Sequence, residues 1–155
     1  MKKVNKVLIM ATLIGLIGNS SNVQGATRLN VDTTNPYEQP KLIRATCYTA
    51  SEGATTYSGQ SVRPGIIAGP KEWLNSVALL YSVKYEDDKP VVDEFIGYYE
   101  VLDTGAGMDT DGDGKGDSIK RGQSIDIFQQ TLSDAYRFRD TYGDYVMLYL
   151  VDGEG

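Results

Sequence analysis

The chain has 155 residues, a formal net charge of −6 and no histidine. Its length suits one domain with a modest core. Because the chain is acidic and shows no basic patch, nucleic acid and anionic membranes are excluded as partners. The absence of histidine excludes Ser-His-Asp and Cys-His catalysis as well as His-ligated metal sites, so carboxylates are left as the acid–base groups.

The first 25 residues have the features of a secretory signal peptide. Lys2, Lys3 and Lys6 precede an apolar run over residues 7–18, and small residues follow up to Gly25. The run is shorter than the ~20 apolar residues that a membrane span needs. We therefore expect cleavage after Gly25, no lasting membrane insertion and a secreted product, with an uncleaved anchor as the alternative.

Residues 26–41 are polar, contain two prolines and show no periodicity, so they are predicted to form a linker to one domain over 42–155. The single cysteine, Cys47, cannot form an internal disulfide. It lies in a strand-like run with no group nearby that would stabilise a thiolate, which indicates a small buried residue rather than a nucleophile.

From residue 42 onward, short β-type runs alternate with turns rich in glycine, proline and aspartate. Six short strands favour a closed barrel or a sandwich, and closure is favoured because it removes exposed strand edges. The predicted strands are Leu42–Ala50, Gly65–Ala68, Val77–Tyr85, Glu94–Asp103, Ser124–Phe128 and Tyr145–Val151.

Two short helical segments interrupt the strands. One is a single turn over Lys71–Asn75, and the other spans Leu132–Thr141 with Thr131 as its predicted N-cap. The second helix is predicted to pack on the barrel through three residues at helical spacing, Leu132, Ala135 and Tyr136.

Two aspartates on either side of a Gly- and Asp-rich loop are the candidate catalytic groups. Asp103 ends a β-rich run and precedes a glycine turn, where a carboxylate can face a groove. Asp126 lies between Ile125 and Ile127, so a strand would anchor its neighbours in the core and hold the carboxyl on the opposite face. The alternative is that both are ordinary strand-end or turn aspartates.

The strings around these aspartates resemble a known family. V-L-D-T-G from Val101 and I-K-R-G-Q-S-I-D-I-F from Ile119 resemble the 3D domain, which is named for three aspartates. The chain is similar to the catalytic barrel of the A-type membrane-bound lytic transglycosylase. The upstream strings A-T-C-Y-T and T-T-Y-S-G-Q resemble the family's opening, so the resemblance covers residues 44–151. It implies a mainly β fold, a six-stranded double-psi β-barrel with one or two short helices.

The resemblance also implies a function. It indicates a secreted, wall-associated monomer that cleaves the glycan strands of peptidoglycan, with Asp126 as single acid/base and Asp103 as its partner. Because the substrate's own C6 hydroxyl can act as the nucleophile, the chemistry requires no cofactor. Family positions that shape the substrate groove match Thr56 and Thr104, and Lys120 matches a turn that could hydrogen-bond substrate.

Aromatic residues offer further candidates for sugar binding. Tyr48, Tyr57 and Trp73 fall at strand ends or in turns, where a ring can serve as a stacking platform. The tyrosines at alternating strand positions, such as Tyr98 and Tyr149, are expected in the core or on the sheet surface.

The sequence departs from the family at its first aspartate. The family pattern there is close to I-A-V-D-P, whereas this chain has Ile66-Ile67-Ala68-Gly69-Pro70. A second function is therefore open, a non-catalytic glycan-binding or wall-loosening module similar to expansins. A wall protein that acts only with a partner, and hydrolysis in place of an anhydro product, are open as well.

The loop over residues 109–117 matches a D-x-D-x-D-G calcium loop in part. The residue at position 12 of that motif is Lys120 instead of the usual bidentate glutamate, so any site should be weak, with a Kd of ~10⁻⁴–10⁻³ M. Calcium would order the loop without touching substrate, and the alternative is a flexible acidic hairpin tip with no ion. The predicted ligands are Asp109, Asp111, Asp113, Asp117 and the carbonyl of Lys115.

Overall fold

The computed structural model describes residues 40–151. The predicted signal peptide and all but the last two residues of the predicted linker lie outside this range. The described part contains six strands, one α-helix and one 3-10 turn, so the mainly β prediction is confirmed. Within residues 40–151, no helix is long and apolar enough to cross a membrane.

All six predicted strands are present. Their bounds are β1 Lys41–Tyr48, β2 Ile66–Ala68, β3 Val77–Glu86, β4 Lys89–Asp103, β5 Ser124–Phe128 and β6 Tyr145–Val151. The largest difference is β4, which begins at Lys89 instead of Glu94. Asp87 and Asp88 both have positive φ, 50° and 59°, as a tight hairpin turn requires, so the ladder between β3 and β4 extends to the turn.

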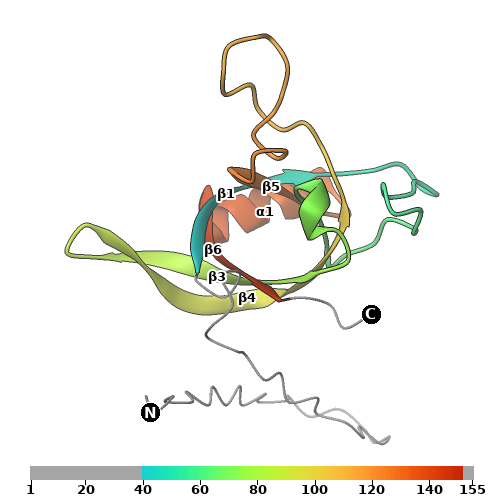
Figure 1. Ribbon diagram of the computed structural model, residues 1–155. Coiled ribbons are helices and arrows are strands. Elements are labelled where there is room, and N and C mark those ends of the chain that lie inside the picture. The colour runs from blue at the N-terminus through green and yellow to red at the C-terminus, as the bar shows by residue number, and fades with distance from the viewer. Residues whose placement is uncertain (1–39, 152–155) are drawn as a thin grey trace, which may run out of the picture. The chain divides into compact units, whose positions relative to one another are not determined.

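The six strands form one sheet that closes on itself in the order β1-β5-β2-β4-β3-β6 (Figure 1). Two of the pairings are parallel, β1 with β5 and β2 with β4, and the other four are antiparallel. Every strand therefore has two neighbours, which removes long free edges. The double-psi classification of this barrel stays a prediction.

The barrel interior holds a continuous apolar core. Ile125 and Ile127 of β5 have no exposed surface, as the alternation of that strand predicts, and Ile67 and Val101 join them from β2 and β4. Residues of these strands that alternate with the core residues must face outward. Asp126 is therefore mounted on the outer face of a wall whose inner face is fully packed.

The helix α1, Leu132–Tyr142, begins where it was predicted, and the Thr131 side chain accepts a hydrogen bond from the backbone N–H of Asp134 at 3.1 Å. The predicted packing face is wrong, because Leu132 and Tyr136 are 65% and 64% exposed. Phe138 and Tyr142 contact the core instead, with ring centroids 5.0 Å apart. Two aromatic rings one turn apart bury more apolar area than the predicted face does, and this sets the rotation of the helix.

The short 3-10 turn Lys71–Trp73 changes the interpretation of one aromatic residue. Trp73 is only 9% exposed and belongs to the core, so its prediction as a sugar platform is wrong. The turn follows β2 directly, and this places the indole against the barrel wall. Tyr98, by contrast, is 51% exposed on the sheet surface, as expected from its strand position.

The segment 104–123 stands away from the barrel and joins β4 to β5 (Figure 1). Its base is fixed by Ser118, whose hydroxyl accepts a hydrogen bond from the backbone N–H of Met108 at 2.7 Å. The same hydroxyl lies 2.7 Å from that of Ser124, the first residue of β5. Gly107 has φ +75°, and an added Cβ there would collide with the Ser118 hydroxyl and lie 2.8 Å from the Ile119 backbone nitrogen.

Gly107→Ala should therefore destabilise the protein by about 3 kcal/mol, because it adds a backbone clash to the strain of positive φ. Gly112→Ala is the matched control: its φ is +82°, but nothing lies within 4 Å of the added Cβ. We expect it to cost only about 1 kcal/mol. Urea denaturation of the two variants measures the difference, and equal losses would contradict a rigid loop base.

Candidate active site

The two predicted catalytic aspartates lie on one line across the barrel wall. Asp126 of β5 pairs with Thr46 of β1 on one side and with Ala68 of β2 on the other. Ala68 in turn pairs with Asp103 of β4. The ladder between β2 and β4 has a bulge between Ile67 and Ala68, so the pairing alone does not place the Asp103 side chain. The outward side chains of β1 do, because Thr46 bonds to Asp126 and Tyr48 bonds to Asp103, so both carboxyls face outward. Their backbones are two strand spacings apart, roughly 10 Å.

Thr46 is the direct partner of Asp126. Its hydroxyl lies 3.0 Å from Asp126 Oδ1 and 3.1 Å from the carbonyl oxygen of Ile125. A hydroxyl has one proton to donate and can also accept. It can donate to Asp126 when that carboxyl is ionised, and it can turn to the Ile125 carbonyl and accept from Asp126 when the carboxyl is protonated. Thr46 can thus serve both states of an acid/base.

The pKa of Asp126 is raised above its ordinary value. The main cause is burial beside the packed wall, and the negative charge of Asp103 adds to it. The hydrogen bond from Thr46 acts in the opposite direction and only partly offsets these effects. The folded protein therefore holds the Asp126 proton to a higher pH than an unfolded chain does, which suits a general acid.

Asp103 is held by three donors. Its Oδ1 accepts hydrogen bonds from the backbone N–H groups of Tyr57 and Thr104, both at 2.9 Å, and its Oδ2 accepts one from the Tyr48 hydroxyl at 3.1 Å. The contact with Tyr57 also fastens the long segment between β1 and β2 to the end of β4. Asp103 is thus a fixed acceptor with little freedom to turn.

Tyr48 was predicted to be a stacking platform for sugar, but its ring and its hydroxyl are both engaged within the protein. Its ring packs edge-on against Phe128, with centroids 5.5 Å apart, while its hydroxyl donates to Asp103. Burial and the charge of Asp103 raise the pKa of Tyr48, so the phenol stays protonated and remains a donor. The structure therefore shows it orienting a carboxylate. Tyr57 is 58% exposed and keeps the exposure that a platform needs.

The other predicted substrate residues are placed as follows. Thr104 contacts Asp103 through its backbone. Thr56 is 5% exposed, and its hydroxyl lies 2.9 Å from that of Ser58 and accepts from the Gln60 N–H at 3.2 Å, so it holds its own turn together. Lys120 is exposed and makes no ion pair with any residue in 40–151.

Cys47 is half-buried against the core, and burial raises the pKa of its thiol to about 11. It is therefore a thiol at neutral pH, in agreement with the prediction that it is not a nucleophile.

Gly69 stands where the resembled pattern has its first aspartate, and it is tightly packed. A Cβ added at Gly69 would lie 3.1 Å from Val101 Cγ1 and 3.2 Å from Trp73 Cε3, which is tighter than ordinary contact. An aspartate there would require the side chains of Val101 and Trp73 to shift by a few tenths of an ångström. The packing at this position therefore disfavours a third carboxyl.

Sequence reasoning missed Thr46 and the role of Tyr48. The signal was present in A-T-C-Y-T, because alternation puts Thr46 and Tyr48 on the face opposite Ala45 and Cys47. The pairing of β1 with β5 identifies the partner of Thr46, and the closure of the barrel identifies the partner of Tyr48. Of two surface hollows beside α1, neither has Asp103 or Asp126 in its lining.

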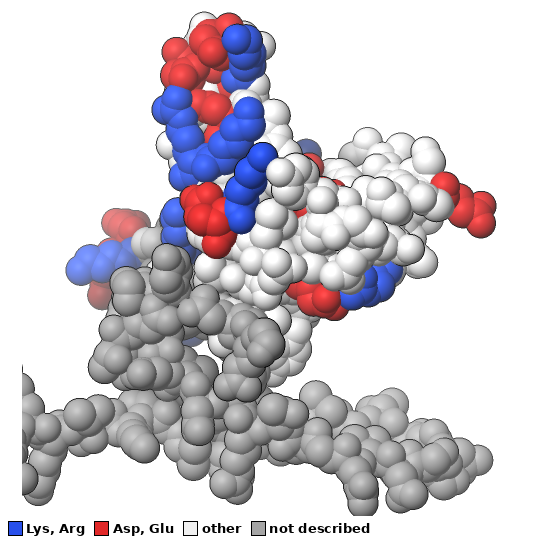
Figure 2. All heavy atoms as spheres, turned by 45° about the vertical axis from the view of Figure 1, so that its right-hand side comes forward, with Lys and Arg blue, Asp and Glu red and all other residues white. Residues whose placement is uncertain are grey.

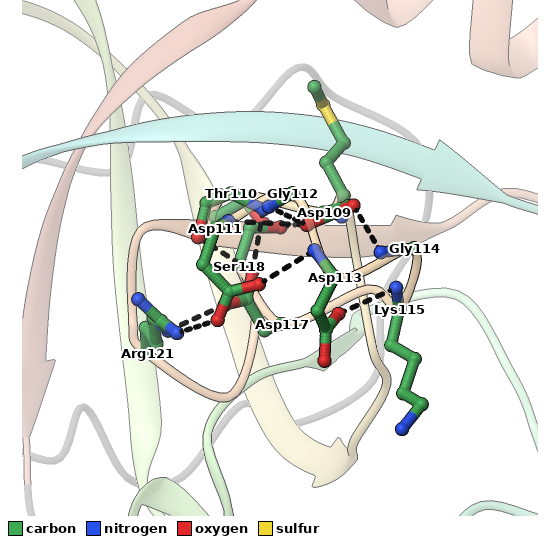
Figure 3. Close-up of polar contacts among 12 residues, drawn as sticks. Asp109, Thr110, Asp111, Gly112, Asp113, Gly114, Lys115, Asp117, Ser118 and Arg121 are labelled. Carbon is green, nitrogen blue, oxygen red and sulfur yellow. Dashed lines mark hydrogen bonds and ion pairs between the residues drawn. The ribbon is translucent and has the colours of Figure 1, made fainter.

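The Asp-rich loop brings three of its predicted calcium ligands together. One oxygen from each of Asp109, Asp111 and Asp113 lies within 4.8 Å of the others, and these residues are exposed (Figure 3). Asp109 accepts hydrogen bonds from the backbone N–H groups of Gly112 at 2.7 Å and Gly114 at 2.8 Å, which lower its pKa. The loop is therefore folded around Asp109.

The fourth predicted carboxylate is already engaged. Asp117 accepts from the Thr110 hydroxyl at 2.6 Å and pairs with Arg121 Nε at 2.6 Å, and Arg121 also pairs with Asp111. Figure 2 shows acidic and basic side chains side by side over this loop, whereas the neighbouring barrel face is mostly uncharged. Arg121 thus supplies part of the positive charge that an ion would bring. Lys115 contacts Asp113 through its backbone N–H at 2.8 Å.

Replacing Thr46 by valine should raise the pKa of Asp126 further, because the lost hydrogen bond stabilises the ionised carboxyl. Carbon-13 NMR titration of the side-chain carboxyl measures the shift. Thr46→Ser keeps the hydroxyl and should titrate close to the wild type. An unchanged or lowered pKa in Thr46→Val would show that Thr46 does not stabilise the carboxylate.

Calcium binding by the loop stays a prediction with a direct calorimetric test. Titration of the chelator-treated protein should give heat with a Kd of ~10⁻⁴–10⁻³ M and raise the melting temperature. Asp109→Asn should remove both effects, whereas Asp140→Asn on the exposed face of α1 should keep them. The absence of heat and of any melting shift in the wild type would leave Arg121 as the loop's only counter-charge among the described residues.

The chain was also compared with known proteins. No family model and no curated protein matches it. Among solved structures, it is similar to an apo form of a variant of the E. coli lytic transglycosylase MltA, with 14% sequence identity and a TM-score of 0.41. The likeness covers 66% of this chain and 28% of that one.

Proposed function

We propose that this protein is a secreted enzyme that cleaves the glycan strands of peptidoglycan by a lytic transglycosylase-type reaction. The observation that carries the proposal is Asp126, a half-buried carboxyl with a raised pKa that faces outward beside a second carboxylate. In a chain without histidine, such a group is the natural general acid. The motif resemblance supplies the substrate class and the location at the cell wall.

The reaction can run on Asp126 alone. The protonated carboxyl donates its proton to the glycosidic oxygen as the bond to the anomeric carbon breaks, and the leaving sugar departs as an alcohol. The resulting carboxylate then takes the proton from the C6 hydroxyl of the remaining sugar, whose oxygen attacks the anomeric carbon. An anhydro ring forms, the acid is regenerated and no water is consumed. The nucleophile is part of the substrate, so its effective molarity is high.

The hydrogen bonds that Asp103 accepts favour this reaction over hydrolysis. Three of its acceptor positions are occupied by Tyr57, Thr104 and Tyr48, so it is poorly placed to bind and activate a water. Asp103 instead supplies a fixed negative charge that stabilises the oxocarbenium ion and keeps Asp126 protonated.

The proposed family fold is the double-psi β-barrel. It is supported by the two parallel pairs in the closed sheet, β1 with β5 and β2 with β4, which meet through the antiparallel pair of β2 and β5. The two short central strands are β5, which carries Asp126, and β2, which carries Ala68. Asp103 lies at the end of β4, next to β2. Such a wall holds both carboxyls on rigid elements.

A second function has one specific observation in its favour. The tight packing around Gly69 disfavours an aspartate at that position of the resembled pattern, as would be expected of a barrel that binds glycan without cleaving it. A wall-loosening or glycan-binding module would keep its affinity for sacculi and release no anhydro-muropeptides. Mass analysis of the material released from purified sacculi separates the two functions.

Asp126→Asn should abolish release of anhydro-muropeptides without weakening the fold. The pKa of Asp126 is higher in the folded state than in the unfolded chain. The contribution of this carboxyl to folding stability is therefore fully present below the unfolded pKa and is lost as pH rises through the folded pKa. Above its folded pKa the ionised carboxyl is therefore a cost to stability that asparagine removes. The variant should melt at or above the wild-type temperature at pH 7 and at or below it near pH 3.

The matched variant is Asp103→Asn, which should lower the rate without abolishing it, since it removes a charge but leaves the acid in place. Release at the wild-type rate from Asp126→Asn would assign the chemistry to another group. Release by neither the wild type nor either variant, together with sedimentation on sacculi, would establish the binding module.

A further inference from the structure

A hollow of about 240 Å³ lies between β1 and α1. It exists because β1 pairs with β6 only over residues 41–44, after which β1 continues beside β5. The edge of β1 that β6 leaves free is covered by α1. Arg44 and Thr46 line the hollow from β1, Tyr136 and Arg139 line it from α1, and Asp144 lies at its end.

The charges in this hollow do not balance. Arg139 is paired with Asp144, with Nε and Oδ1 2.9 Å apart. Arg44 has no carboxylate within ion-pair distance among residues 40–151, and its buried Nε has no hydrogen-bond partner. Buried donors without partners are rare because they lose their hydrogen bonds to water and gain none from the protein. In a protein of net charge −6, an unpaired guanidinium in a hollow indicates an anion-binding site.

The hollow adjoins the acid/base. Thr46 both lines the hollow and donates to Asp126. Arg44 precedes it by two residues on the same strand, so the two side chains lie on the same face roughly 7 Å apart along β1. A glycan strand cleaved at Asp126 would therefore bring a substituent of a neighbouring sugar within reach of Arg44.

We propose that this hollow binds a carboxylate on a side branch of the glycan substrate, and that Arg44 is the residue that selects for it. This inference rests on the proposed function. The volume lies below the ≈ 300–1,000 Å³ of pockets for whole ligands, so it suits a branch rather than a sugar. Peptidoglycan strands carry carboxylates on their peptide branches, or on the lactyl group where the peptide has been removed, whereas neutral amino-sugar polymers carry none. Guanidinium binds carboxylate through two parallel hydrogen bonds.

The test compares native sacculi with sacculi whose carboxylates have been converted to amides by carbodiimide and ammonia. The polymer is the same, and only the charge differs. We expect wild-type kcat/KM to be about tenfold higher on native sacculi, the effect of about one charge-assisted hydrogen bond. In Arg44→Gln this native-to-amidated ratio should fall to about one. Arg63→Gln, which breaks an exposed pair with Glu100, should keep the wild-type ratio.

A second variant keeps the test independent of any folding defect in Arg44→Gln. Ala135 lines the same hollow from α1, and Ala135→Glu would place a carboxylate of the protein's own beside Arg44. It should also bring the ratio to about one. A ratio that stays near ten in both folded variants overturns the subsite while the proposed function stands. A wild type that cleaves neither material overturns the proposed function, and the subsite that rests on it falls with it.

Discussion

The register between β1, β5, β2 and β4 is the constraint on which the site depends. It puts Thr46, Asp126, Ala68 and Asp103 on one line, and a shift of one residue in β5 would turn the Asp126 carboxyl into the core. The isoleucines on either side of Asp126 prevent such a shift, because both are fully buried and a slip would expose them to water. The apolar core thus fixes the positions of the polar groups on its outer face.

The same wall gives the two aspartates opposite environments. Asp126 has one hydroxyl donor and an apolar surround, so burial dominates its pKa. Asp103 has two backbone N–H groups and a phenol, so its orientation is set before any substrate arrives. Two like charges on one face are normally unfavourable, and the raised pKa of Asp126 eases this repulsion because that carboxyl holds its proton to a higher pH than in an unfolded chain. The resulting cost to stability is the expected mark of a site selected for chemistry.

The sequence was enough to predict the six strands, because alternation and turn residues act locally, but it could not predict how they pair. Leu132 and Tyr136 looked like a packing face until tertiary contacts rotated α1 onto Phe138. Trp73 looked like a platform because a turn residue is usually exposed, yet the turn lies against the wall. Tyr48 shows the same limit: its strand face was predictable, but its partner Asp103 depends on the closure of the barrel. Local patterns predict elements, and long-range register decides which side chains meet.

The tip of the protruding segment 104–123 is connected to the two aspartates only through the base of that segment. The tip carries its own counter-charge in Arg121, whereas the base is fastened by Ser118, whose hydroxyl contacts Ser124 two residues before Asp126. Any ordering of the tip must pass through this base to reach β5. The tip contains Gly112 and Gly114, which have positive φ and open space around them, so we expect these glycines to take up small displacements of the tip before they reach the base. An ion at the tip would therefore change the stability of the loop more than the geometry of the carboxyls.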